Sequence, residues 1–226
     1  MGYVITIDGP AASGKTSVSR EIARKLNIPW VSTGAFYRGL ALAAIKQNIS
    51  LTDKIALSEL ATSPIWRVEM TTEKTKVWFK DIDVTEEIAK EEVGNYASQV
   101  SHYPEVRTSL LDQQRNCAFV AEGLVAEGRD CGTVVFPKAE VKIYLTARSE
   151  NRAQRRAQEL GLDEKEMAQQ QKQRDQQDSG RKTAPLQIPE GAFVVDTSEL
   201  DLAQVLSKIE THLKEKALSA SNSKTL

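Results

Sequence analysis

The sequence predicts an α/β fold, because short apolar strands alternate with amphipathic helices along the chain. Residues 3–26 open with an apolar, β-branched run, continue through a glycine-rich loop, and end in a segment with apolar residues at helical spacing. Later apolar runs predict further core strands at residues 30–32, 118–128, 141–145 and 193–196. A chain of 226 residues suits one such domain, and we expect residues 1–226 to form it.

The glycine-rich loop has the spacing of a phosphate-binding P-loop, G-x-x-x-x-G-K-[ST], from Gly9 to Thr16. Glycines let the backbone approach an anion closely, and the N–H groups at the helix start attract phosphate. We expect Lys15 to reach the β- and γ-phosphates of ATP and the Thr16 hydroxyl to bind Mg²⁺. A chance glycine-rich turn is the alternative, but it would not require the flanking strand and helix. The expected ATP-binding residues are Gly9, Pro10, Ala11, Ala12, Ser13, Gly14, Lys15, Thr16 and Ser17.

Composition narrows the class of protein. Hydrophobic residues make up 40% of the chain and charged residues 27%, as is ordinary for a globular protein. The net charge of −1 gives no reason to expect nucleic-acid binding, and no apolar run is long enough to span a membrane. Cys117 and Cys131 match neither a disulfide framework nor a zinc pattern. We expect a cytoplasmic monomer that acts on small molecules, with no nucleic-acid or membrane partner.

The segment Thr33-Gly-Ala-Phe-Tyr-Arg38 suggests a second anion site, between a short strand and an apolar helix. Thr33 alone could be only a helix cap and Arg38 only a surface residue, but near a P-loop the two could bind a phosphate together. Farther on, residues 65–79 alternate apolar and polar side chains around a charged turn, which predicts a β-hairpin inserted into the α/β pattern. Helices are expected at residues 51–62, 86–100 and 104–116.

The third core strand ends in Glu127-Gly-Arg-Asp130. An acidic residue at the end of a strand beside the P-loop strand can hold Mg²⁺ through a water molecule, so Glu127 is a second candidate for the metal site. Thr197 or Ser198 is expected to cap a final helix, and residues 217–226 to form a disordered polar tail. The apolar face of that helix carries Leu202, Val205, Leu206, Ile209 and Leu213.

The region between the last two strands is the most charged part of the chain. Arginines at 148, 152, 155 and 156 recur at helical spacing, and a stretch rich in Gln, Lys and Arg follows. A solvated charged arm is the ordinary explanation of such a pattern. A P-loop kinase, however, needs a mobile lid that brings cations over the transferring phosphate, and residues 148–182 are suitably placed for one.

Taken together, these segments resemble the bacterial-type cytidylate kinase family of nucleoside monophosphate kinases over about residues 3 to 213. Only the P-loop is specific by itself, whereas the order and spacing of all the motifs are very specific. The matching motifs are Ile7-Asp-Gly-Pro-Ala-Ala-Ser-Gly-Lys15, Thr33-Gly-Ala-Phe-Tyr-Arg38, Ala97-Ser-Gln-Val100, Val106-Arg107, Gly128-Arg-Asp-Cys-Gly-Thr-Val-Val-Phe-Pro137, Arg152-Ala-Gln-Arg-Arg156 and Arg174-Asp-x-x-Asp178-x-x-Arg181.

The resemblance implies a P-loop kinase fold with a five-stranded parallel sheet, helices on both faces, an acceptor region enlarged by a small β-containing insert (about residues 33–100), and a helical lid. It implies transfer of the γ-phosphoryl group of ATP, with Mg²⁺, to CMP or dCMP. The residues it implies for catalysis are Lys15, Arg129, Arg152, Arg156 and Arg174. Those it implies for CMP binding are Thr33, Tyr37, Arg38, Ser98, Arg107, Arg129, Asp130, Arg174, Asp178 and Arg181.

Two features of this chain depart from the family pattern. Ser32 stands where an acidic residue is common, which leaves its local role open, and Gln177 and Ser179 make the lid less basic than in some relatives. The expected chemistry agrees with the absence of a His or Cys dyad near the motifs. A nucleoside monophosphate is already an ionised oxygen nucleophile, since its second phosphate pKa is about 6, so no general base is needed.

Two other classes of P-loop protein account for fewer of these motifs. A P-loop kinase for a sugar or shikimate-like hydroxyl would need a base and would lack residues that recognise a nucleobase. A nucleotide-binding switch of the GTPase type would recognise guanine through Asn-Lys-x-Asp, and the sequence contains no such segment. Each class leaves several of the motifs unexplained.

Overall fold

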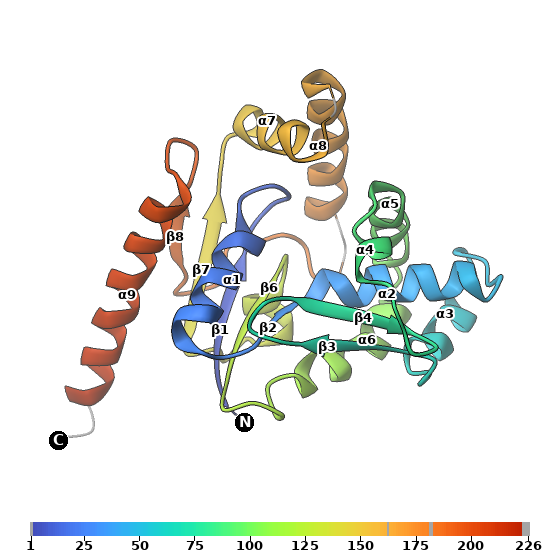
Figure 1. The fold of residues 1–226 in the computed structure, drawn as a ribbon, viewed down its shortest axis with the longest axis horizontal. Coiled ribbons are helices and arrows are strands. Elements are labelled where there is room, and N and C mark those ends of the chain that lie inside the picture. Colours follow the sequence, from blue (N-terminus) through green and yellow to red (C-terminus); the bar gives the residue numbers. More distant parts are fainter. Residues whose placement is uncertain (1, 162, 181–182, 223–226) are drawn as a thin grey trace.

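A five-stranded parallel sheet forms the centre of the computed structural model, which describes residues 2–161, 163–180 and 183–222. The strand order is β2-β6-β1-β7-β8, with the P-loop strand β1 in the middle (Figure 1). This confirms the expected fold. The strands are β1 (Tyr3–Asp8), β2 (Trp30–Ser32), β6 (Gly123–Gly128), β7 (Val141–Thr146) and β8 (Phe193–Asp196).

Two apolar clusters cover the two faces of this sheet. On β1, Ile5 and Ile7 face the cluster that contains α1 (Lys15–Leu26) and α9 (Leu202–Asn222), whereas Val4 faces the other. Because side chains alternate along a strand, Thr6 and Asp8 lie on the Val4 face. Helices on or near that face are α2 (Thr33–Lys46), α3 (Lys54–Ala61), α5 (Glu91–Val100) and α6 (Pro104–Asn116), with the short π-helix η1 (Cys131–Val135).

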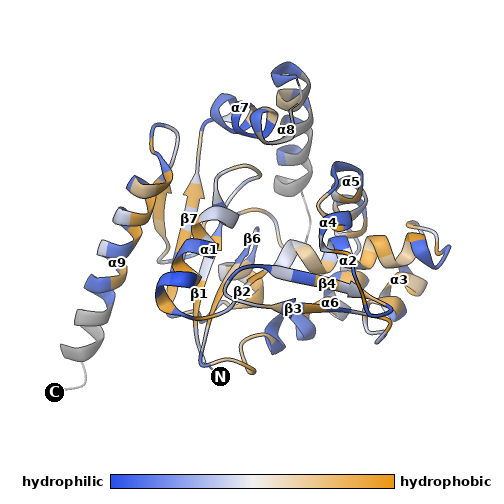
Figure 2. Ribbon diagram, in the orientation of Figure 1, coloured by the Kyte–Doolittle hydropathy of each residue, from blue (hydrophilic) through white to orange (hydrophobic). Residues whose placement is uncertain are grey.

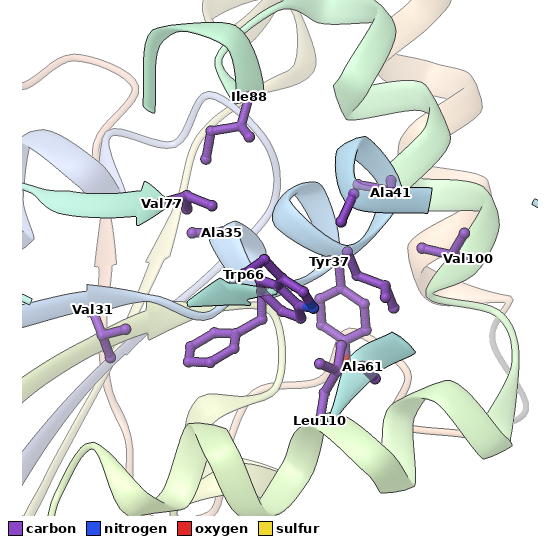
Figure 3. Packing of buried hydrophobic residues seen from close by; sticks show 14 of the residues in the cluster. Val31, Ala35, Tyr37, Ala41, Ala61, Trp66, Val77, Ile88, Val100 and Leu110 are labelled. Carbon is purple, nitrogen blue, oxygen red and sulfur yellow. The ribbon is translucent and has the colours of Figure 1, made fainter. Parts of the chain in front are cut away.

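The expected hairpin belongs to a three-stranded antiparallel sheet, β3-β4-β5. Val77 and Phe79 are buried on one face, as the alternation predicted, and Trp66 packs edge-on against Phe36 of α2. Figure 3 shows Val77, Trp66 and Leu110 in the same apolar cluster, so this sheet extends the main core. Its strands are β3 (Trp66–Met70), β4 (Thr75–Phe79) and β5 (Ile82–Asp83).

The predicted helix at residues 86–100 is wrong as one element. The chain forms α4 (Thr85–Ile88) and then α5, with extended backbone at Lys90 between them. The break turns the carbonyl groups of Ile88 and Lys90 toward Arg38, whose Nη1 donates to them at 2.6 and 3.1 Å. The Arg38 guanidinium thus gives a partner to the Ile88 carbonyl, which a continuous helix would have used internally, while the Lys90 carbonyl also accepts the Gly94 N–H at 3.1 Å.

The C-terminal predictions also need correction. Asp201, and not Thr197 or Ser198, caps α9, because its carboxylate accepts the Gln204 N–H at 2.8 Å while the Gln204 side chain accepts the Asp201 N–H at 3.0 Å. Leu202 is 39% exposed, because it occupies the first turn, outside the apolar face. The expected tail is helical from 217 to 222, where Ala217, Leu218 and Ala220 have high helix propensity, and residues 223–226 lie outside the described part.

The charged region forms two helices, α7 (Ser149–Leu160) and α8 (Glu164–Ser179), which pack on each other beyond the end of β7 (Figure 1). Hydrophobic residues gather along β1, β7 and α2, whereas α7 is mostly hydrophilic (Figure 2). Among the side chains described in the two helices, Ala153, Ala157 and Met167 are the buried apolar ones. No helix in the described ranges is long and apolar enough to cross a membrane.

Candidate active site

A cleft of about 510 Å³ opens at the carboxyl ends of β1, β2 and β6. One end is formed by the P-loop and the other by α2, α5 and α6. Most of the residues predicted for ATP and CMP binding line it. They are Ala11, Ala12, Gly14, Lys15, Thr16, Ser17, Thr33, Tyr37, Arg38, Ser98, Arg107, Arg129 and Asp130.

The P-loop has the tight backbone that its glycines predicted. Gly9 and Gly14 have φ of 150° and 90°, and a Cβ on Gly9 would lie 2.1 Å from the Leu145 carbonyl oxygen, so only glycine fits there. Lys15, the first residue of α1, is 7% exposed, and its Nζ donates to the Pro10 carbonyl at 2.6 Å. The ammonium group is thereby held inside the loop.

The two candidate metal ligands are neighbours. The Thr16 hydroxyl donates to Glu127 Oε1 at 3.1 Å, and Glu127 is 5% exposed at the end of β6. A hydroxyl and a carboxylate oxygen side by side form the kind of donor set that Mg²⁺ accepts when a nucleotide completes it. The residues present therefore fit the ion, at the point where the P-loop meets β6.

Thr33 is held at the floor of the cleft beside β6, where its hydroxyl donates to the Glu127 carbonyl at 3.0 Å and lies 3.5 Å from the Cys131 sulfur. Arg38 lies one turn farther along α2 and reaches the break between α4 and α5. Ser32, the departure from the family pattern, also lines this wall. The structure thus places the two residues of the proposed second anion site on one wall of the cleft.

The buried end of the cleft contains an ion pair between Arg107 of α6 and Asp130, which are 8% and 7% exposed. The Arg107 guanidinium also lies 5.4 Å from the centre of the Tyr37 ring. Ser98 of α5 lines the same space. This end therefore presents a carboxylate and a guanidinium in a desolvated setting, although the two contact each other in this structure.

The arginines expected at the transferring phosphate surround the P-loop. Arg129 donates to the Gly9 carbonyl at 3.1 Å. Arg152 donates to the Ala11 carbonyl at 3.3 Å and forms a two-contact ion pair with Asp175, at 3.1 and 2.6 Å. Arg156 lines the cleft and pairs with Glu91 of α5 at 2.9 Å. The structure thus brings Arg152 and Arg156 of α7 to the cleft region.

The remaining predicted residues belong to the lid. Arg174 and Asp178 lie in α8, but their side chains are outside the described part, as are those of Gln177 and Ser179. Arg181 lies wholly outside the described residues. The positions of these three predicted site residues relative to the cleft therefore stay predictions.

Sequence reasoning missed two residues. Arg155 lines the cleft and donates to the Thr197 hydroxyl at 3.0 Å, and its helical spacing from Arg152 was the available signal. Asp8 is fully buried at the end of β1, and its signal was a charged residue in an apolar strand. Burial raises the pKa of Asp8 to about 6, although N–H donors from Gly132 and Cys131 oppose the shift. Burial also raises the pKa of the Cys131 thiol well above its usual value, so the thiol stays protonated at neutral pH.

Comparison with known proteins shows the family of this chain. A family model described as cytidylate kinase matches residues 5–215. A cytidylate kinase of Bdellovibrio bacteriovorus is 63% identical over 216 residues, covering 96% of this chain and 100% of that protein. A cytidylate kinase of Caldanaerobacter subterraneus subsp. tengcongensis is 42% identical over 212 residues, covering 91% of this chain and 92% of that protein.

Among solved structures, a gluconokinase from Sinorhizobium meliloti aligns with a TM-score of 0.52 and 16% identity, covering 99% of this chain and 96% of that one. At so low an identity the likeness supports the fold alone. The sequence relatives and the family model cover nearly the whole chain and include the P-loop, the Arg107 region and α7. The chain therefore belongs to the cytidylate kinase family.

Proposed function

We propose that this protein transfers the γ-phosphoryl group of ATP to CMP or dCMP, producing ADP and CDP or dCDP. The observation that carries the proposal is one cleft with a P-loop at one end and a buried Arg107–Asp130 pair at the other. The first suits a triphosphate and the second suits a base with both donor and acceptor groups. Family membership favours this acceptor over a sugar or shikimate-like alcohol.

The ATP phosphates lie along the P-loop, where Lys15 offers its ammonium group to the transferring phosphate. Thr16 and Glu127 would hold Mg²⁺, and the ion when bound would neutralise charge on the phosphate oxygens. Arg129, Arg152, Arg156 and Arg174 supply further positive charge where negative charge develops in the transition state. Cationic groups around the phosphates are what this reaction requires from the protein.

The acceptor phosphate binds between Thr33 and Arg38, with Arg129 beside it. No general base is required, because the phosphate is already ionised at neutral pH. The protonated Cys131 thiol is consistent with a reaction that needs no cysteine nucleophile. The lid, about residues 148–182, closes over the phosphates and excludes water, and Arg174, Asp178 and Arg181 bind the acceptor when it does so.

Cytosine binds at Arg107 and Asp130, with Ser98 and Tyr37 beside it. Cytosine has an amino donor at C4 and acceptors at N3 and O2, which suit a carboxylate and a guanidinium. To bind the base, the two side chains exchange part of their mutual contact for contacts with cytosine. A cytoplasmic location and a monomeric state stay predictions from the sequence.

A coupled assay of ADP release across CMP, dCMP, UMP, AMP and GMP, together with a sugar and a shikimate-like alcohol, tests the proposal. We expect turnover with CMP or dCMP at least about 100-fold more efficient than with UMP, because a polar site rejects a base whose donors and acceptors are reversed. Turnover of an alcohol without turnover of CMP would contradict the proposal. Loss of all turnover after Mg²⁺ is removed with a chelator, and recovery on adding it back, tests the metal requirement.

A further inference from the structure

Asp8 is a buried carboxylate that has no role in the chemistry described above. It is the last residue of β1, immediately before Gly9 of the P-loop, and it is fully buried. Its Oδ1 accepts the backbone N–H of Cys131 at 2.7 Å, and its Oδ2 accepts that of Gly132, also at 2.7 Å. Both carboxylate oxygens thus hold the start of η1.

The residues immediately before η1 are those that face the substrate. Asp130 precedes Cys131 and forms the buried pair with Arg107, and Arg129 donates to the carbonyl of Gly9. In addition, the Val134 and Val135 N–H groups donate to the Asp130 carbonyl at 2.9 and 3.1 Å. A shift of η1 would therefore move the backbone from which both Arg129 and Asp130 project.

The fit between Asp8 and η1 is close. A Cβ added to Gly132 would lie 2.8 Å from Thr6 Oγ1, 2.9 Å from Pro189 Cγ and 3.1 Å from Asp8 Oδ2. Two of these atoms belong to the β1 face that carries Asp8. The glycine therefore allows the η1 backbone to approach that carboxylate, which a larger residue would push away.

Stability alone does not account for a carboxylate at this position. Burial raises the pKa of Asp8 to about 6, which means that the folded environment disfavours the ionised form. At neutral pH the group therefore stays charged against a desolvation penalty. A buried charge is costly unless it is hydrogen-bonded, and the two backbone N–H donors of η1 meet this one.

We infer that Asp8 is a positioning residue for the acceptor site, which fixes Arg129 and Asp130 by holding the backbone of η1 against the P-loop strand. The inference rests on the proposed function, because it concerns the affinity for CMP. It predicts that a change at Asp8 alters the affinity for CMP far more than the affinity for ATP. Asp8 itself touches neither substrate, so its effect passes through residues 129 and 130.

The test is calorimetric titration of the full-length protein with CMP and, separately, with an ATP analogue that cannot be hydrolysed. An Asp8→Asn side chain keeps one acceptor oxygen but turns an NH₂ group toward the second backbone N–H. We expect the Kd for CMP to rise about tenfold or more, since an unpaired buried N–H has roughly that effect on an equilibrium constant. The Kd for the ATP analogue should change less than about threefold, because the P-loop donors stay in place.

Thr6→Val is the matched control, since Thr6 lies on the same strand face and its buried hydroxyl has no hydrogen-bond partner among the described residues. That variant should keep both affinities. If Asp8→Asn does not fold, Gly132→Ala perturbs the same contact from the other side and should also weaken CMP more than ATP. Unchanged CMP affinity, or equal weakening of both ligands, would overturn the inference, whereas failure of the wild-type protein to bind CMP would instead overturn the proposed function.

Discussion

The buried wall of the cleft and the lid hold their arginines in different ways. In the wall, Arg107 pairs with Asp130, whose side chain is only 7% exposed. The lid arginines pair with more exposed carboxylates: Arg152 (7% exposed) pairs with Asp175 (27%), and Arg156 (18%) pairs with Glu91 (23%). Removing one member of a buried pair leaves an uncompensated charge, whereas an ion pair near water is weak and easily exchanged.

This difference suggests two roles. The Arg107–Asp130 pair is already formed in the ligand-free protein, because its buried charges are shielded from water and must pair with each other. The lid arginines are held by carboxylates that phosphate groups can replace. Alterations of the P-loop or wall should therefore have large, substrate-specific effects, and alterations of the lid contacts should have small effects on its motion.

The largest effect is expected at the P-loop end of the cleft, from Lys15→Ala. This change removes a buried cation from the transferring phosphate, and we expect turnover to fall by about 10²–10⁴ while CMP affinity is largely kept. Steady-state kinetics and CMP titration measure the two quantities. Lys25→Ala, on the same helix but 51% exposed at the side chain and paired with Glu210, is the control and should keep wild-type turnover. If Lys15→Ala kept more than about a third of the activity, the donor assignment would be wrong.

The next effect concerns the wall. Asp130→Ala should lower kcat/KM for CMP far more than for UMP, because it removes the carboxylate that favours the cytosine amino group over the uracil carbonyl. We expect a CMP preference of about 100-fold to be largely lost, since each mismatched buried polar group costs about 1–3 kcal/mol.

Asp130→Asn should be measured alongside, because it keeps the shape and limits any loss of folding. Asp81→Asn is the matched surface control, because it alters only an exposed ion pair with Arg67. It should leave the preference for CMP over UMP unchanged. An equal fall for CMP and UMP in the Asp130 variants would make Asp130 a scaffold residue, and base recognition would have to lie elsewhere.

The sequence predicted the P-loop, the sheet and the residues of the Arg107–Asp130 pair better than it predicted the contacts of the lid. The P-loop and the sheet follow from local patterns, because strand, loop and helix are adjacent in the chain. Arg107 and Asp130 come from separate elements, so the resemblance named them but could not show that they pair. Glu91 could not be foreseen as a partner of Arg156, since that contact depends on the break after α4, which propensity did not predict.

Asp8 shows a further limit of local reasoning. As a charged residue in an apolar strand it could be noticed, but its partners are backbone N–H groups 123 and 124 residues away. Such contacts depend on how η1 folds back onto β1, and no side-chain pattern encodes that approach. The glycine at position 132 was available as a signal, yet its closeness to Asp8 is visible only in the folded chain.

The smallest effects are expected in the lid helices α7 and α8, where hydrogen exchange measures them. We expect ATP plus CMP to slow exchange of amides in α7 and α8. The substrate phosphates would bind arginines that pair with carboxylates in the ligand-free protein, and the two helices would then close over the cleft. Helix α9 serves as an internal reference, since its buried face packs on the sheet and it carries none of the residues assigned to the cleft. Equal exchange in α7 and α8 with and without both ligands would contradict the proposal of a closing lid.

A single substitution separates the lid contact from the effect of the ligands. Glu91→Gln removes the charge that pairs with Arg156, and it should speed exchange in α7 of the ligand-free protein by about 1.4- to fivefold, since a partly exposed ion pair contributes roughly 0.2–1 kcal/mol. Glu92→Gln is the matched control, because the Glu92 carboxylate accepts the Tyr96 hydroxyl on the same helix and makes no link to α7 among the described contacts. With ATP and CMP bound, the Glu91 variant should match the wild type, because substrate phosphates then occupy Arg156. A difference that persisted in the liganded state would mean that Glu91 holds the closed lid itself and is not exchanged for substrate.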